Sequence, residues 1–205
     1  TVFMKCLCGF LKPTTGKVTV DGKEVGKEID FPQDLGLMIE TPGFIPYMSG
    51  KSNLKNLALI RNQIGNYEIE EALRSVGLDP NLKKHVSKYS LGMRQRLGIA
   101  QAFLESPRIL LLDEPTVGLD LEERAEFKRM IQEAGKEMTV ILSTHIVSDV
   151  EETADYILVM NEGKVLENHA MSYYMKQIED KELTGLEQYY LHLTGRKLHD
   201  TGNEI

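Results

Sequence analysis

The chain has 205 residues, enough for one domain or for one domain with a subdomain, and a hydrophobic share of 41% allows a sizeable core. The net charge of −7 and the pI near 5.3 argue against a general affinity for nucleic acid. No apolar run approaches the ~18 residues that a membrane-spanning helix needs, so membrane association would have to come through a partner.

The first forty residues predict a helix, a hairpin and a strand. The apolar stretch 2–8 is expected to be helical. Residues 17–20 alternate as a strand does, and the Asp-Gly pair at 21–22 is a strong hairpin signal. Residues 35–39 predict another strand, which ends at Glu40. The two cysteines of the chain lie in the first helix on different faces, which favours reduced thiols over a disulfide or a metal pair.

The middle of the chain is mostly helical in pattern. Residues 41–50 are rich in proline and glycine and predict a loop. Residues 51–104 then predict helices, the last of which is capped by Ser90 and runs to Phe103.

Strands and helices alternate again in the last third of the chain, before an acidic tail. A short terminal helix is expected from Leu186, with Gly195 as its stop signal, and Tyr189 and Tyr190 are interpreted as packing residues. The chain is therefore expected to be one nucleotide-binding domain over 1–205, with an α/β core at 1–44 and 105–165, a helical subdomain at 45–104, and a C-terminal helical tail at 166–205.

Residues 108–145 carry the most informative pattern. The apolar strand of RILLLDEPTVGLD ends in Asp113 and Glu114, a loop carries Asp120 just beyond it, and a second apolar strand ends before His145. Open parallel sheets place their ligand chemistry at such strand ends. An aspartate there can hold magnesium, a glutamate can orient or deprotonate an attacking water, and a histidine can stabilise phosphate charge. Taken singly, these side chains could also be solvated loop acids and an ordinary histidine.

Together, these motifs resemble those of the ATP-binding cassette (ABC) ATPases. ILLLDEP is similar to the Walker B strand of that family, TVGLD to its D-loop, STH to its switch histidine, and YSLGMRQRLGIAQA, from Tyr89, to the signature and its helix. Each motif alone is weak, but the ordered set is specific. The resemblance covers residues 1–165. It implies an α/β fold, a P-loop NTPase-type (RecA-like) core with an inserted α-helical subdomain and an antiparallel β element near the N-terminus.

The resemblance implies roles for the strand-end residues. Asp113 would organise the magnesium ion, Glu114 would be the catalytic base, and His145 would contact the γ-phosphate. Asp120 would shape the dimer interface beside the nucleotide.

The signature implies a second half of the nucleotide site. A helix N-terminus attracts phosphate, and in the family Ser90 and Gly92 would contact ATP held by the other subunit. The sequence departs from the common LSGGQ, since Leu91 replaces the first glycine and Met93 the glutamine. This departure puts the strength of the contact in question, and the alternative is a plain serine-capped helix.

Two further residues are candidate ligands of magnesium and nucleotide. The family usually has glutamine at the strand end occupied here by Glu40, and the acid resembles cassettes of bacterial antibiotic and lantibiotic self-protection exporters. A carboxylate can also bind magnesium, although Glu40 could instead be a solvated loop residue. Thr1 aligns with the hydroxyl residue that follows the Walker A lysine, which implies a magnesium ligand.

The glycine-rich loop and lysine of Walker A, G-x-x-x-x-G-K, do not occur in the sequence. We expect that the chain is a piece of a longer one, cut inside this motif, and that by itself it binds ATP weakly or not at all. The alternative is a natural protein without the motif.

The leading functional hypothesis is the ATP-binding and hydrolysing subunit of a bacterial exporter, with ATP and Mg²⁺ in its site. Its partners would be a separate membrane permease and a second nucleotide-binding domain, identical or paired, and not nucleic acid. It would lie in the cytoplasm, on the inner face of the cell membrane. A soluble ABC ATPase of translation or DNA repair is the alternative, although such proteins usually carry two cassettes or a long coiled-coil insertion. Glu114 and His145 argue against a third class, a non-catalytic interaction module.

Overall fold

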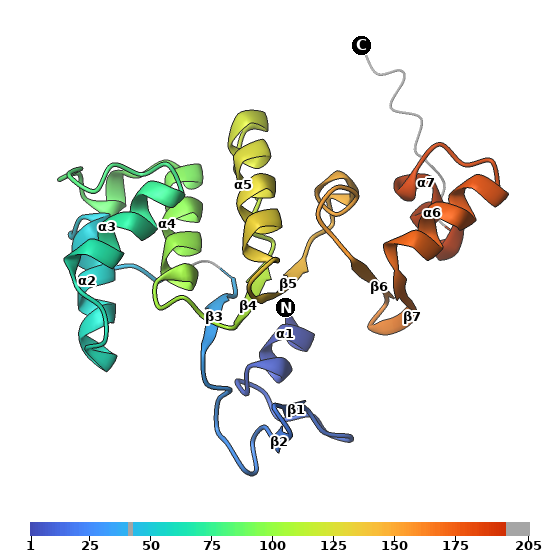
Figure 1. Cartoon of the computed structure of the whole chain (residues 1–205), viewed down its shortest axis with the longest axis horizontal. Helices are drawn as coiled ribbons and strands as arrows, with labels where there is room; N and C mark the ends of the chain where they lie inside the picture. The colour runs from blue at the N-terminus through green and yellow to red at the C-terminus, as the bar shows by residue number, and fades with distance from the viewer. Residues whose placement is uncertain (41–42, 196–205) are drawn as a thin grey trace. The chain divides into compact units, whose positions relative to one another are not determined.

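The computed structural model describes residues 1–40 and 43–195, in two compact units of which the second begins at His145 (Figure 1). The first unit contains α1 (Val2–Leu7), β1 (Thr19–Val20), β2 (Lys23–Glu24), β3 (Leu35–Met38), α2 (Gly50–Arg61), α3 (Asn66–Ser75), the 3₁₀ turn η1 (Val86–Lys88), α4 (Leu91–Phe103), β4 (Ile109–Asp113), α5 (Leu121–Ala134) and β5 (Thr139–Ser143). The second contains η2 (Val147–Asp149), β6 (Tyr156–Asn161), β7 (Lys164–Ala170), α6 (Met171–Asp180) and α7 (Leu186–Thr194).

A parallel three-stranded sheet in the order β3-β4-β5 forms the centre of the first unit. Its middle strand is buried on both faces, as the unbroken run of leucines predicts. Leu110 and Leu112 pack into the large cluster that includes side chains of α4 and α5, whereas Leu111 packs against Met4 of α1 and Cys8 at its end. Helices therefore cover both faces, and the predicted α/β class is confirmed.

The helices between β3 and β4 form one group, coloured teal to green in Figure 1. Helix α2 begins at Gly50, because Ser49 caps it and accepts a hydrogen bond from the backbone N–H of Ser52. Helix α4 packs directly on β3, where Gly36 permits a close approach. A Cβ atom at Gly36 would lie only 2.0 Å from the backbone oxygen of Ala102 in α4. The helical group is thereby seated on the edge of the sheet.

Near the N-terminus, β1 and β2 form the predicted antiparallel hairpin. Asp21 and Gly22 have φ angles of 50° and 79°, so both occupy the left-handed region that a tight two-residue hairpin turn requires. The Asp-Gly signal and the expected antiparallel element are confirmed.

The second unit is a β6-β7 hairpin packed with two helices. The strand β7 continues to Ala170 because it pairs with β6, so residues 166–170, predicted with the helical tail, are strand, and the helices begin only at Met171. The side chain of Tyr189 is 2% exposed, and α7 ends at the left-handed Gly195, as predicted. Within residues 1–40 and 43–195, no helix combines the length and the apolar character needed to cross a membrane.

Candidate active site

The strand-end aspartate lies between two hydroxyl groups. Asp113, the last residue of β4, is 6% exposed and pairs in register with Ser143, the last residue of β5. The Ser143 hydroxyl donates a short hydrogen bond to one carboxylate oxygen of Asp113, and the Thr1 hydroxyl donates to the other at 2.6 Å. Two residues 112 positions apart, each a predicted magnesium ligand, thus meet at the carboxyl end of the sheet.

The electrostatics of Asp113 favour its charged form. Burial acts most strongly and opposes ionisation. Hydrogen bonds from Ser143 and Thr1 act in the opposite direction, and the pKa of Asp113 lies below its ordinary value. The site therefore holds a carboxylate, which is the form that binds a divalent cation.

This pKa shift predicts the acid behaviour of the chain. Because the folded-state pKa of Asp113 lies below its ordinary value of 3.8, the ionised group stabilises the fold above about pH 4, and this contribution is lost as the pH falls through the folded pKa. The free energy of unfolding should fall more steeply below about pH 4 in the unaltered chain than in Asp113→Asn. Urea unfolding between about pH 2 and 6 measures this, with the exposed Asp21→Asn as control. Equal acid slopes for the unaltered chain and Asp113→Asn would contradict it.

Two glutamates follow the paired ends of β3 and β4 in the same way. Met38 pairs with Leu112, and Glu40 and Glu114 each stand two residues further on. Both have left-handed backbones, with φ angles of 60° and 50°. Non-glycine residues rarely adopt this conformation, and such strain gathers at functional sites because the surrounding structure must support it.

The backbone of Glu114 is held on both sides. Its N–H donates to the carbonyl of Ser143 at 2.9 Å, and its own carbonyl accepts a 2.9 Å hydrogen bond from the side-chain amide of Gln95 in α4. The side chain of Glu114 lies half-buried at the rim of the strand-end site. These two bonds fix the backbone of the residue that directly follows Asp113.

Glu40 meets a cation from the first helix. Its exposed carboxylate forms an ion pair of 2.6 Å with the ammonium group of Lys5, one turn into α1 from Thr1. The acid is thereby neutralised locally by a residue that the sequence analysis did not single out. The spacing of four residues between Thr1 and Lys5 is a signal that could have found it, since it places both on one helix face.

The signature and the D-loop are packed against each other. Ser90 caps α4 and accepts a hydrogen bond from the N–H of Met93 at 3.1 Å, which confirms the predicted cap. A Cβ atom on the buried Gly92 would lie 3.1 Å from the carbonyl oxygen of Gly118, and one on Gly118 would lie 2.5 Å from the side chain of Leu91. Glycine at both positions therefore permits the close approach of the two loops.

Asp120 organises the start of α5. Its carboxylate accepts from the N–H of Glu123 at 2.9 Å, while the Glu123 carboxylate accepts from the N–H of Asp120 at 3.1 Å, forming a capping box. Glu123 also pairs with Arg96 of α4 at 3.0 Å. The predicted interface residue Asp120 is thus fixed to its own helix and, through Glu123, to the signature helix.

His145 is exposed and opens the second unit, two residues beyond the end of β5. Its predicted contact with the γ-phosphate remains an expectation.

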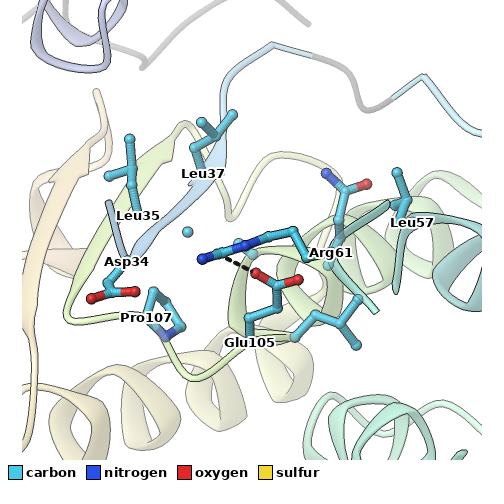
Figure 2. A pocket seen from close by; sticks show the side chains of 11 residues that line it. Asp34, Leu35, Leu37, Leu57, Arg61, Glu105 and Pro107 are labelled. Atoms are coloured by element: carbon cyan, nitrogen blue, oxygen red, sulfur yellow. Dashed lines mark hydrogen bonds and ion pairs between the residues drawn. The ribbon is translucent and has the colours of Figure 1, made fainter. Parts of the chain in front are cut away.

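A separate hollow lies near the amino end of β3, and the strand-end residues do not line it. It has a volume of about 180 Å³ and is lined by Asp34, the first residues of β3, and the last turns of α2 and α4. Figure 2 shows Arg61 reaching across it to Glu105, with which it forms an ion pair of 2.6 Å. None of the candidate site residues lines this hollow.

The donor chemistry of the strand-end cluster fits magnesium. This ion favours oxygen ligands, keeps several waters, and is commonly held by one or two carboxylates together with substrate phosphates. The cluster offers one ionised carboxylate, Asp113, and the hydroxyl of Thr1. Within the described residues there is no group of three or more His, Cys, Asp and Glu that would make an all-protein metal cage.

Comparisons with known proteins identify the family. A sequence model described as ABC transporter matches residues 1–117. The chain is 39% identical over 170 residues to the bacitracin transport ATP-binding protein BcrA of Bacillus licheniformis, which covers 82% of this chain and 56% of that protein. It is 37% identical over 169 residues to the lantibiotic transport ATP-binding protein SrtF of Streptococcus pyogenes, covering 81% of this chain and 72% of that protein.

A solved structure agrees with these matches. It is a dimeric ATP-binding cassette in a post-hydrolysis state with ADP and phosphate bound, 20% identical, with a TM-score of 0.72 over 83% of this chain and 79% of that one. Fold and strand-end residues together define an α/β protein of the P-loop NTPase type, as predicted. Within that class, the chain belongs to the ABC transporter family. The expected similarity to antibiotic and lantibiotic cassettes is confirmed by these bacitracin and lantibiotic transport relatives.

Proposed function

We propose that this chain is part of the ATP-binding and hydrolysing subunit of a bacterial ABC exporter. The main support for this proposal is the strand-end cluster, in which Asp113 accepts hydrogen bonds from Thr1 and Ser143 and is followed by the strained Glu114. The bacitracin and lantibiotic relatives are named as transport ATP-binding proteins, which supports export of a peptide antibiotic as the process served. The chain covers 56% of the length of the bacitracin relative, so activity and partners are proposed for the full-length protein.

The residues divide the chemistry of phosphate release among them. Thr1 and Asp113 would hold magnesium, which would neutralise charge on the phosphates. Glu114 would orient the attacking water and accept its proton, and His145 would contact the γ-phosphate. Glu40 would meet the same site from the end of β3, with Lys5 as its counter-ion.

The full-length protein provides the direct test. It should release phosphate from ATP in a magnesium-dependent reaction, and Asp113→Asn should remove the magnesium dependence together with most of the activity. Asp21→Asn, which makes the same change at an exposed aspartate in the β1-β2 turn, is the matched control. An Asp113→Asn variant with unchanged turnover and unchanged magnesium dependence would remove the basis of this assignment.

Two copies would form the complete site. In this arrangement Ser90 and Gly92 of one subunit meet the nucleotide on the other, and Asp120 shapes the contact between them. The exposure of Leu91, Val117 and Leu121, at 56%, 39% and 84%, supports an interface at the D-loop, since such side chains gain from burial. The related cassette of similar fold is a dimer. The partner is either an identical subunit or a second nucleotide-binding domain.

The membrane partner would be a separate permease, which places the protein in the cytoplasm against the inner face of the membrane. We propose that Glu40 and the loop at 41–50 form the groove that receives it, although Thr41 and Pro42 lie outside the described residues. Tyr47 is 68% exposed at the entry to α2, whereas Phe44 packs in part against the helical cluster. A soluble ATPase of translation or DNA repair has no comparable support, because the relatives named here are transport proteins.

Crosslinking locates this groove. A photoreactive residue at Tyr47 of the full-length complex should crosslink to the permease, and one at Phe44 should do so less efficiently because its side chain is half-buried. The same probe at Tyr190, on α7, serves as control. Crosslinks that gather at Tyr190 rather than Tyr47 would show that the groove has been placed on the wrong segment.

A further inference from the structure

We propose that Gln95 is a positioning residue for Glu114; this inference rests on the ATPase function proposed above. The side-chain amide of Gln95, in the second turn of α4, donates a 2.9 Å hydrogen bond to the backbone carbonyl oxygen of Glu114. The bond is partly buried and joins two segments 19 residues apart. It acts on the backbone of the proposed base and leaves the carboxylate itself untouched.

This bond supports a conformation that Glu114 does not favour by itself. With φ at 50°, Glu114 needs surrounding contacts that fix its backbone. Its N–H is fixed to Ser143, and its carbonyl receives both the Gln95 amide at 2.9 Å and the N–H of Val117 at 3.4 Å. The shorter of these two bonds comes from Gln95. Because the backbone sets the direction in which the side chain leaves, Gln95 controls where the carboxylate of the base is placed.

Further contacts connect the same helix with the same loop. The side chain of Leu91 lies over Gly118, and Arg96 pairs with Glu123 at 3.0 Å. Glu123 belongs to the capping box of α5, the helix that follows the loop. The beginning of α4 and the loop 114–123 are thus joined at three points along their length. In the proposed dimer, Ser90 at the tip of this helix meets the partner's nucleotide while Glu114 serves its own. Gln95 lies on the helix that begins at Ser90 and is hydrogen-bonded to Glu114. It therefore links the partner's nucleotide site to the base of its own.

The test separates positioning from folding. In the full-length protein, Gln95→Met keeps the length of the side chain but loses the donor, and Gln95→Glu keeps the shape but presents an acceptor to the carbonyl oxygen. Both should lower kcat by roughly tenfold or more, the scale of a displaced reacting group, with KM for ATP within about two-fold. Gln101→Met, on the same helix, should change neither quantity. The thermal midpoints of Gln95→Met and Gln101→Met should agree.

A second measurement needs no nucleotide. In the 205-residue chain, Gln95→Met should accelerate amide hydrogen exchange at Glu114 and residues 116–119 and leave the exchange of β4 unchanged. A kcat within about two-fold of the unaltered protein, or an equal loss in Gln101→Met, would overturn the inference. So would unchanged exchange at Glu114 and residues 116–119. If the unaltered full-length protein releases no phosphate at all, the proposed function fails instead, and the exchange measurement still decides whether Gln95 holds the Glu114 backbone.

Discussion

Replacing Glu114 with glutamine should lower phosphate release by the full-length protein roughly 10²-fold or more, the scale of a lost general base. The amide keeps the shape of the side chain, and the backbone bonds to Ser143 and Gln95 remain, so the site should stay assembled. ATP binding should persist through the phosphate loop and Asp113. The ATP-bound dimer should therefore accumulate, since closure needs ATP and opening needs hydrolysis, and size exclusion with ATP would detect it.

Glu40→Gln is the matched control, because it changes the other strand-end glutamate in the same way. It restores the residue common in the family and releases Lys5 from its 2.6 Å ion pair at a partly exposed position. We expect turnover within a few-fold of the unaltered protein, as exposed ion pairs contribute little. If Glu40→Gln abolished turnover and Glu114→Gln did not, the base would have been assigned to the wrong strand end.

Gly36→Ala should destabilise the 205-residue chain by about 3 kcal/mol, in the range of severe core substitutions. The added Cβ atom would lie 2.0 Å from the backbone oxygen of Ala102 and 2.7 Å from the ring of Pro107, so α4 would have to move off β3. Urea denaturation measures the loss as a shift of the midpoint.

Gly43→Ala is the control for this substitution, because a Cβ atom there has nothing within 4 Å. It should change the free energy of unfolding by no more than about 0.5 kcal/mol. A Gly36→Ala chain with an unchanged midpoint would mean that α4 is not seated on β3 in solution.

Local signals were sufficient for much of the fold. The alternation and Asp-Gly turn of the first hairpin, the serine cap at Ser90 and the glycine stop at Gly195 each depend on a few neighbouring residues, and the structure has each where it was predicted. The beginning of the helical tail was predicted too early. Residues 166–170 form strand instead, because pairing with β6 decides their state.

The candidate site was predictable to the extent that motifs fix it. The apolar run ending in Asp113 and Glu114 predicts the carboxyl end of a strand, and β4 does end at Asp113. Ser143 could have been found in the same way, because it ends the neighbouring strand in register with Asp113. Gln95 could not have been found from the sequence. Its bond to Glu114 depends on how α4 packs on the loop after β4, and no spacing along the chain predicts that contact.

The contact between Leu91 and Gly118 limits how a signature motif can be transferred from one transporter to another. A leucine at the first of these positions occupies the space that any side chain at the second would need, since a Cβ atom on Gly118 would lie 2.5 Å from it. The two residues are 27 positions apart in the chain and belong to different motifs. A chimera that contains this signature should therefore also contain the D-loop glycine, so the two residues should be transferred together.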